Sequence, residues 1–420
     1  NKSAEKFKQA DNDYGEGVAL YYGGVAYEYN NQQPAALDNY KRALAVREKL
    51  LKEYPNEESY STDLYNSLSV LGRLFKSIEN YDTAKEFYLR ALNVARSIGD
   101  KENEATSYWD LGNLAEQSNS YQSGIENFEK SYQIYSTLSD SSSMIELRRN
   151  QAISYAKLKM VSNSKQSIAK AIALARSWNK PDKLAYVLNY QGLLGYENKD
   201  YELSLQSYLE SEKINRSLGD TTELISAKKN ISKAYRDSKK IKPAIAQSEE
   251  IILMVKANDL DGKASALWDL AYLYGKDYAN QLKKGIGYYT EASKLYAKLN
   301  DTTNLITVSN NIAFQYRDLK DSVNAYKFHN YALSLTTAKA RLTERADTYD
   351  RIGITADHFK NYQSGLSAHL EALHLFKESK EWKKAGKAAE DVATAYKEFD
   401  DFVKVAQYYK ESIQLYRQAS

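Results

Sequence analysis

The fold is decided by a stretch between residues 105 and 138, which reads ATSYWDLGNLAEQSNSYQSGIENFEKSYQIYSTL. Apolar residues recur along it at the 3.6-residue period of an α-helix and not at the two-residue period of a strand. A short polar break at residues 118–120 divides the pattern into two parts, Ala105 to Gln117 and Tyr121 to Leu138. The stretch therefore predicts two antiparallel helices joined by a tight turn.

The same unit recurs along the chain about every 40 residues, with eight extra residues between the first and second units and two in the turn of the seventh. Such a period is typical of an array of stacked structural repeats. Short polar breaks mark the ends of successive units at Gly99–Asp100, Ser139–Asp140, Asn179–Lys180, Gly219–Asp220 and Asp259–Leu260, and Asn300–Asp301 follows one residue late. Helical stretches lie on both sides of each break. The sequence therefore predicts one helical hairpin per unit, repeated along the chain.

Each unit also carries a fixed pattern of small and large residues. In the quoted unit, Gly112 is followed by Gly124, by the aromatic Phe128 and by Ser131. The preceding unit repeats the pattern with Gly72, Ala84, Tyr88 and Ala91. Small residues allow two helix backbones to approach closely where they cross, and a large ring fills the space that remains.

This pattern resembles the tetratricopeptide repeat, whose signature is W-x2-L-G-x2-Y followed by A-x3-F-x2-A. The resemblance extends over residues 17–420. The repeat has about 40 residues here in place of the usual length of about 34. The resemblance implies an all-α, right-handed superhelical solenoid of about ten helix-turn-helix hairpins with a concave groove. The longer repeat is similar to those of helical cell-polarity scaffolds and bacterial peptide-sensing regulators.

We expect residues 17–420 to form a single solenoid domain, and residues 1–16 to form a lead-in that is either a frayed remnant or a further helix. The repeats are predicted to start near residues 17, 65, 105, 145, 185, 225, 264, 306, 346 and 386. The chain does not begin with Met, and its last predicted helix ends near Ser420 without a polar capping repeat. We therefore expect a longer protein, in which a transmembrane helix can adjoin this segment.

Charge and cysteine content narrow the possible functions. The 58 Lys and Arg residues nearly balance the 55 Asp and Glu residues, so a net charge of +3 predicts no overall attraction to nucleic acid or to anionic lipid. The absence of cysteine excludes disulfides and thiolate sites. No apolar run approaches the roughly 18 residues that cross a bilayer. The cysteine-free composition, rich in Asn, Lys and Tyr, is similar to that of Bacteroidetes proteins and favours a periplasmic over a cytoplasmic location without establishing either.

Motifs that would indicate catalysis or metal binding are not found in the sequence. His329 and His369 lie one repeat apart, at the aromatic-filling position of adjacent repeats, and His358 and His374 have no partner at the i,i+4 spacing of a chelating helix. A structural role is therefore favoured over a ligand role for the histidines. No catalytic residue, cofactor site or metal site is predicted, and we do not expect an enzyme.

The resemblance implies that a ligand lies along the first helices of the repeats. Counted from the small residue at the helix crossing, the groove-facing positions are three residues before it and one after it, and the position two before it often carries a backbone-binding asparagine. The predicted partner-binding residues are Trp109, Asn113, Arg149, Asn150, Asn189, Tyr190, Lys229, Asn230, Lys233, Arg236, Trp268, Tyr272, Asn310, Asn311, Phe314 and Arg317.

The charges among these residues predict what kind of guest the groove holds. Arg149, Lys229, Lys233 and Arg236 would make the middle of the groove cationic, which favours acidic residues or a terminal carboxylate. The alternative is that they are ordinary solvated charges, because an error of one residue rotates a side chain by about 100° around the helix. The lysine, asparagine and arginine set of the family's carboxylate clamps does not recur at matching positions.

Three functions follow from this sequence. The first is a non-catalytic scaffold that binds a protein or peptide segment in the groove. The second is an extracytoplasmic sensory input domain of a bacterial membrane-bound transcriptional regulator or histidine kinase. The third, RNA reading by helical repeats, is disfavoured because acidic residues interrupt any continuous basic stripe, namely Asp110, Asp269, Asp350 and Glu390.

Overall fold

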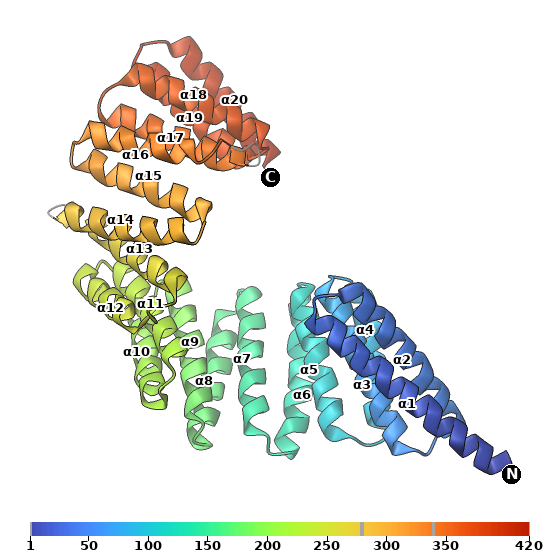
Figure 1. The fold of residues 1–420 in the computed structure, drawn as a ribbon. Helices are drawn as coiled ribbons and strands as arrows, with labels where there is room; N and C mark the ends of the chain where they lie inside the picture. Colours follow the sequence, from blue (N-terminus) through green and yellow to red (C-terminus); the bar gives the residue numbers. More distant parts are fainter. Residues whose placement is uncertain (1, 278–280, 338–340, 420) are drawn as a thin grey trace. The chain divides into compact units, whose positions relative to one another are not determined.

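A computed structural model describes residues 2–277, 281–337 and 341–419, which form helices and turns without any strand (Figure 1). The prediction of an all-α fold is confirmed. The helices are α1 (Lys2–Tyr29), α2 (Gln33–Glu53), α3 (Glu58–Ser77), α4 (Tyr81–Ser97), α5 (Lys101–Gln117), α6 (Tyr121–Thr137), α7 (Ser141–Lys157), α8 (Val161–Ser177), α9 (Pro181–Glu197), α10 (Tyr201–Leu218), α11 (Thr221–Asp237), α12 (Ile241–Met254), α13 (Leu260–Asp277), α14 (Leu282–Lys298), α15 (Thr302–Asp318), α16 (Ser322–Ser334), α17 (Leu342–His358), α18 (Tyr362–Glu378), α19 (Trp382–Lys397) and α20 (Phe402–Gln418).

The helices pack in consecutive pairs, such as α3 with α4 and α5 with α6, and within a unit one pair contacts the next, as α4 contacts α5. The contacts divide the chain into two compact units. Unit 1 comprises Asn1–Asn198 and Lys213–Leu218, and unit 2 comprises Lys199–Glu212 and Gly219–Ser420. The expectation of one solenoid domain from residue 17 stays a prediction. The lead-in is helical from Lys2 and continuous with the first helix of the first repeat.

Short turns connect most helices and keep the repeat in register. In the turn before α5, Gly99 has a φ of +73°, and the Asp100 amide donates to the Ala95 carbonyl at 3.0 Å. The Asp100 carboxylate then accepts from the Asn103 amide at 2.9 Å and so caps α5. The same left-handed position recurs along the chain, at Glu79, Asn119, Ser139, Lys159, Asn179, Gly219, Lys239, Asn300, Lys320, Lys360, Lys380 and Asp400.

A close contact between a small residue and a ring joins the two helices of a hairpin. A methyl group placed on Gly72 of α3 would lie 2.7 Å from Cδ1 of Tyr88 in α4, and one on Gly112 of α5 would overlap Phe128 of α6 still more. Tyr88 and Phe128 are both buried. Close packing at these two crossings therefore requires glycine on one helix to accommodate the aromatic ring on the other, as the sequence pattern predicts.

Among the described residues, no helix combines the length and the apolarity that crossing a bilayer requires.

Leucine in place of Gly112 should destabilise unit 1 by about 1–3 kcal/mol, because the larger side chain cannot fit against Phe128 without displacing a helix. Urea unfolding followed by far-ultraviolet circular dichroism measures this loss. Gly15 is the matched control in the same unit, since no atom lies within 4 Å of the place where its Cβ would be. Gly15→Ala should gain about 0.5–1 kcal/mol. A Gly112→Leu protein that unfolds at the same urea concentration as the parent contradicts the proposed crossing.

Candidate functional site

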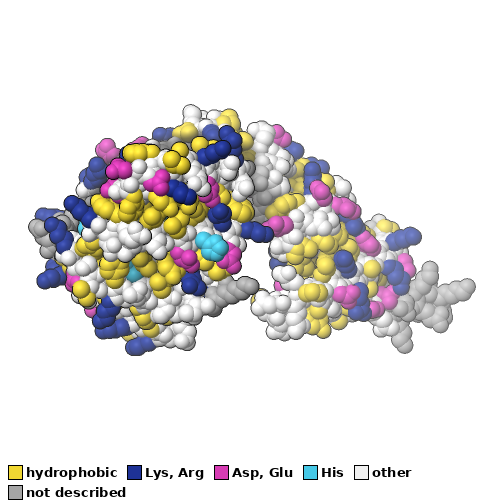
Figure 2. Space-filling view, turned by 90° about the horizontal axis from the view of Figure 1, so that it is seen from above, with side chains coloured by type: hydrophobic (Ala, Val, Ile, Leu, Met, Phe, Trp, Pro, Cys, Tyr) yellow, Lys and Arg dark blue, Asp and Glu magenta, His cyan; other side chains and the backbone are white. Residues whose placement is uncertain are grey.

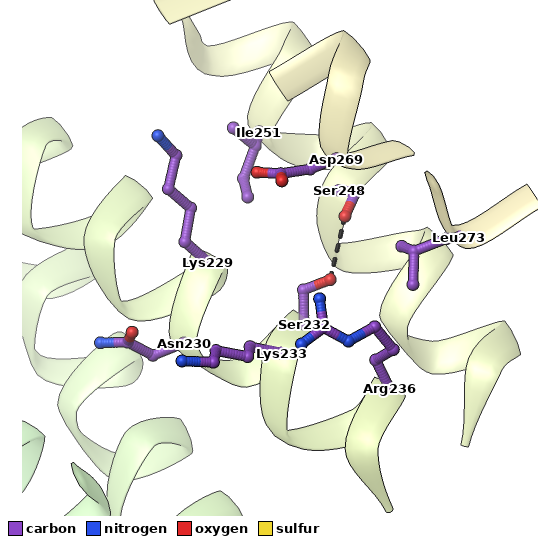
Figure 3. A pocket seen from close by; sticks show the side chains of 9 residues that line it. All are labelled: Lys229, Asn230, Ser232, Lys233, Arg236, Ser248, Ile251, Asp269 and Leu273. Atoms are coloured by element: carbon purple, nitrogen blue, oxygen red, sulfur yellow. Dashed lines mark hydrogen bonds between the residues drawn. The ribbon is translucent and has the colours of Figure 1, made fainter. Parts of the chain in front are cut away.

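A cavity of about 190 Å³ opens among α11, α12 and α13 of unit 2 (Figure 3). Four of the sequence-predicted residues lie together on its α11 wall. The lining consists of Lys229, Asn230, Ser232, Lys233, Arg236, Ser248, Ile251, Asp269 and Leu273. The structure thus brings three predicted cations and one predicted asparagine to a single hollow.

The base of the cavity is held by a hydroxyl pair. Ser232, the small residue at the α11 crossing, donates to the Ala244 carbonyl at 3.0 Å. Its oxygen lies 2.9 Å from the Ser248 hydroxyl, which therefore donates to Ser232. Both serines are buried. This pairing satisfies the polar groups at the base and fixes α11 against α12, so the cavity wall is preorganised.

Two lysines and one arginine carry the positive charge of the cavity wall. Arg236 donates twice to its neighbour Asp237, at 2.7 and 3.2 Å, and its guanidinium lies 5.5 Å from the centre of the Tyr272 ring. Its charge is therefore partly offset by Asp237, and the prediction that Arg236 makes the groove cationic stays a prediction. Lys229 is half-buried and Lys233 is exposed on the same wall.

One acidic group faces these cations. Asp269 enters the cavity from α13 (Figure 3). Burial raises the pKa of its carboxyl group, while Lys229 and Arg236 act in the opposite direction. The cavity therefore combines a basic wall with one partly shielded acid, and it presents both acceptor and donor groups to a guest.

The neighbouring lysine has an entirely different environment. Lys228 is 1% exposed and its ammonium group contacts the carboxylates of Glu212 at 2.8 Å and Glu250 at 2.7 Å, with the Gln247 amide oxygen at 2.9 Å. The rotation of about 100° per helical residue explains why Lys228 is internal and Lys229 lines the cavity. The ion pairs show that Lys228 is structural.

In unit 1, the predicted residues form an aromatic and cationic cluster on α7 and α9. The Arg149 guanidinium lies 4.4 Å from the centre of the Tyr186 ring and 5.2 Å from that of Tyr190, which suits cation–π contact. It also donates to the Asn150 amide oxygen at 3.2 Å. Burial raises the pKa of Tyr190 despite the nearby Arg149. Arg149 is thus held by its neighbours and is less available to a partner than we expected.

The remaining predicted residues of unit 1 lie on the first helices of their repeats. Trp109 of α5 meets the Tyr135 ring edge to face at 6.2 Å. Asn113 of α5 and Asn189 of α9 are half-buried. The acidic residue next to Trp109, Asp110, occupies the same repeat position as Asp269. Burial raises the pKa of Asp110 to about 6, against the opposing effect of Lys76 and Arg73.

Further along unit 2, aromatic residues stand between cationic ones. Trp268 stacks on Tyr272, with ring centres 5.9 Å apart and planes at 10°. Phe314 lies between two guanidinium groups, with Arg317 at 4.5 Å and Arg351 at 5.1 Å from the ring centre. Arg317 also donates to the carboxylate of its neighbour Asp318, which repeats the arrangement at Arg236.

Sequence reasoning missed Arg351. Its guanidinium donates to the Asn311 amide oxygen at 3.3 Å, and the Asn311 amide group lies 3.5 Å from the Tyr289 hydroxyl. Arg351 stands two residues before Gly353, the small residue of its repeat. The rule that selects the position two residues before the small residue, used for the earlier repeats, selects Arg351 when it is applied to this repeat.

The prediction that Asn310 faces the groove is wrong. Asn310 is 2% exposed, and its amide group donates to the Thr348 hydroxyl of α17 at 3.0 Å. Its oxygen lies 2.8 Å from Nδ1 of His329, which must therefore carry the proton, and the Thr355 hydroxyl completes the set at 3.0 Å from Nε2. Burial lowers the pKa of His329 to about 3. The next hairpin packs over this position, so Asn310 serves the core.

Basic and acidic side chains are intermixed on the molecular face that Figure 2 shows. On this face, dark-blue Lys and Arg groups lie beside magenta Asp and Glu groups rather than along one continuous stripe. Binding to the phosphate backbone of RNA requires clustered positive charge. This distribution, together with Asp110 and Asp269 at predicted groove positions, therefore disfavours RNA as a partner.

Comparisons with known proteins concern the fold. Residues 63–137 match the family model described as tetratricopeptide repeat. The chain is similar in structure to a signal transduction ATPase with numerous domains from Pyrococcus horikoshii, which carries a tetratricopeptide repeat sensor. The two sequences are 14% identical, the alignment covers 82% of this chain and 53% of that chain, and the TM-score is 0.53. It is also similar to the apo form of the quorum sensor NprR from B. thuringiensis, with 14% identity, 93% and 99% covered, and a TM-score of 0.49. No curated protein matches the chain.

Acid should destabilise unit 2 through His329. The folded ring stays neutral down to a pKa of about 3, whereas the unfolded ring takes up a proton near pH 6.5. The unfolded state therefore binds more protons as the pH falls, and about 2 kcal/mol of stability should be lost between pH 7.5 and pH 5 from this group. Urea unfolding at the two pH values, compared between the parent and His329→Phe, measures this contribution.

Phenylalanine fills the same repeat position at Phe128, so the variant keeps the shape of the ring. It leaves the Asn310 oxygen without its donor and should be less stable at pH 7.5, but less sensitive to acid. If the parent and His329→Phe lose the same amount of stability between pH 7.5 and pH 5, His329 is not held neutral in the folded protein.

Proposed function

Because this chain is built from tetratricopeptide repeats, we propose that it is a non-catalytic scaffold that binds an extended protein or peptide segment along the first helices of its repeats. The cavity lined by Lys229 and Lys233 carries this proposal. It is open, has a preorganised base and is lined by residues from three consecutive helices.

The size of the cavity favours part of a larger guest over a small molecule. At about 190 Å³ it is smaller than the roughly 300–1,000 Å³ of typical small-molecule pockets. An acidic side chain or the terminal carboxylate of a peptide fits such a volume. Two lysines on one wall favour that charge, since charge-assisted hydrogen bonds to a carboxylate are stronger than neutral ones.

The neighbouring residues suit the rest of a peptide. Asn230 lines the same wall and offers both a donor and an acceptor, which matches a peptide group. On α13, the stacked pair of Trp268 and Tyr272 provides a flat aromatic surface next to Asp269. Aromatic surfaces of this kind commonly anchor an apolar side chain of a partner. The proposed guest is therefore a peptide with an acidic residue or a free carboxylate close to an apolar residue.

A sensory role is the finer proposal. In it, capture of a peptide outside the inner membrane is the input to a regulator or histidine kinase that lies beyond this segment. The composition of the chain, rich in Asn, Lys and Tyr, supports this proposal. Sequencing the full gene tests the sensory proposal, which requires an apolar stretch of about 20 residues soon after Ser420. A stop codon there would contradict the sensory proposal and leave the scaffold proposal unaffected.

Charge reversal in the cavity should weaken the binding of an acidic peptide. The probe is a fluorescein-labelled peptide ending in Leu-Glu with a free carboxylate, and its amidated form. The parent should bind the free form more tightly than the amidated form. Lys229→Glu with Lys233→Glu should weaken binding at least tenfold, since hydrogen bonds to charged groups contribute about 1.5–3 kcal/mol. Fluorescence anisotropy measures both affinities.

Lys242→Glu with Lys256→Glu is the matched control. It changes the net charge by the same amount, and both lysines are exposed and do not line the cavity. The control should keep parental affinity apart from a small effect that salt screens. If the two double variants bind the peptide equally well, the cavity is not the binding site.

A further inference from the structure

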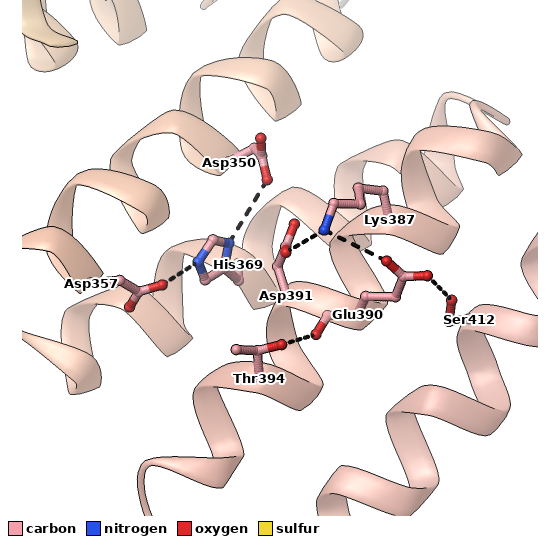
Figure 4. Close-up of polar contacts among 8 residues, drawn as sticks. All are labelled: Asp350, Asp357, His369, Lys387, Glu390, Asp391, Thr394 and Ser412. Atoms are coloured by element: carbon pink, nitrogen blue, oxygen red, sulfur yellow. Dashed lines mark hydrogen bonds and ion pairs between the residues drawn. The ribbon is translucent and has the colours of Figure 1, made fainter.

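Three consecutive helices of unit 2 bring a histidine and two carboxylates together (Figure 4). Asp350 comes from α17, His369 from α18 and Asp391 from α19. One possible ligand atom from each residue lies within 4.8 Å of the others. Asp350 stands three residues before Gly353, and Asp391 two residues before Ala393, so both carboxylates occupy groove positions of their repeats.

His369 fills the position where other repeats have a tyrosine or phenylalanine. It is 1% exposed, and a methyl group on Gly353 would lie 2.6 Å from its Nδ1. The Asp357 carboxylate lies 3.0 Å from Nε2 and can only accept, so Nε2 carries a proton. This hydrogen bond fixes the ring so that Nδ1 turns toward Asp350 (Figure 4).

Nδ1 of His369 is left without a hydrogen bond among the described residues. The nearest Asp350 oxygen is 3.8 Å away, which is too long for one. The corresponding histidine of the preceding repeat, His329, uses both ring nitrogens in hydrogen bonds. A buried nitrogen that lies 3.8 Å from a carboxylate oxygen and makes no hydrogen bond is unfavourable unless a proton or a metal ion is bound to it.

The spacing suits a metal ion. Two ligand atoms that each lie about 2.1 Å from a tetrahedral ion are about 3.4 Å apart, close to the separation of Nδ1 and the Asp350 oxygen. Metal-binding histidines commonly donate their other ring N–H to a carboxylate, as His369 does to Asp357. Imidazole with carboxylates is a donor set that suits zinc and similar divalent transition metals.

We propose that Asp350, His369 and Asp391 bind a divalent transition-metal ion of the zinc class, with Asp357 orienting the imidazole. Three protein ligands leave a further coordination position, which a water or a carboxylate of a bound partner can occupy. The proposal is independent of the cavity at Lys229, which lies on α11. A search for chelating pairs within one helix does not find these ligands, because they come from three helices.

Two cations compete with the metal. Lys387 donates to the Asp391 carboxylate at 2.7 Å and lies 3.6 Å from that of Glu390, so the metal must share Asp391 with it. A proton is the second competitor. Burial disfavours a charged His369 ring, but Asp350 and Asp357 outweigh this and raise its pKa to about 9. Metal binding must displace a proton held on Nδ1.

Isothermal titration of the whole chain with zinc chloride at pH 8 tests the site. The parent should bind one more equivalent of zinc than His369→Phe, which keeps a ring in the slot. His329→Phe, in the same slot of the preceding repeat, should bind zinc as the parent does. Asp391→Asn leaves the histidine slot intact and should weaken the site at least tenfold. Magnesium chloride, which prefers oxygen ligands, should not compete.

Cobalt(II) gives a second readout, because a four-coordinate ion absorbs visible light more strongly than the hydrated ion. This absorption should appear with the parent and with His329→Phe and be lost with His369→Phe. If the parent, His369→Phe and Asp391→Asn bind the same amount of zinc with the same affinity, Nδ1 holds a proton only and the proposal is wrong.

Discussion

The structure depends on one steric constraint, the contact between a small residue on the first helix of a repeat and a ring on the second. At Gly72 and Tyr88 there is no room for even a methyl group, so the ring lies directly on the backbone of the facing helix. This contact sets the distance between the helices of the hairpin. Short capped turns, such as that at Asp100, then hold the register from one hairpin to the next.

The same position can carry different chemistry when its neighbours differ. His329 and His369 fill equivalent slots and are both buried. Asn310 and Thr355 supply hydrogen bonds without charge, so burial dominates and the pKa of His329 is lowered to about 3. Around His369, Asp350 and Asp357 outweigh burial and raise the pKa to about 9. The repeat pattern places the ring, and the side chains around it, on its own hairpin and on the next, decide whether the ring is neutral or positively charged.

Two neighbouring lysines of α11 also have different roles, because one is buried in ion pairs and the other lines the cavity. Lys228 is enclosed by Glu212 and Glu250, whereas Lys229 lines the open cavity. Burying an ammonium group requires paired carboxylates, while a partly exposed lysine keeps its capacity to attract a guest. Lys229, Lys233 and Arg236, which pairs with Asp237, are the basic groups that line the cavity. Because Asp269 also lines the cavity, the wall carries both basic and acidic groups and is not uniformly basic.

The sequence alone determined the helical hairpins, their regular period and the small-to-aromatic contacts, because these features are local: Gly112 and Phe128 lie on the two helices of one hairpin. It also placed Lys229, Asn230 and Lys233 together, since one helix face carries all three. Only the tertiary structure decided that Asn310 is buried beneath Thr348 and that Arg351 reaches Asn311. It alone brought His369 close to both Asp350 and Asp391. These outcomes depend on how one hairpin packs on the next, where a rotation of about 100° per residue decides whether a side chain faces a partner or the core.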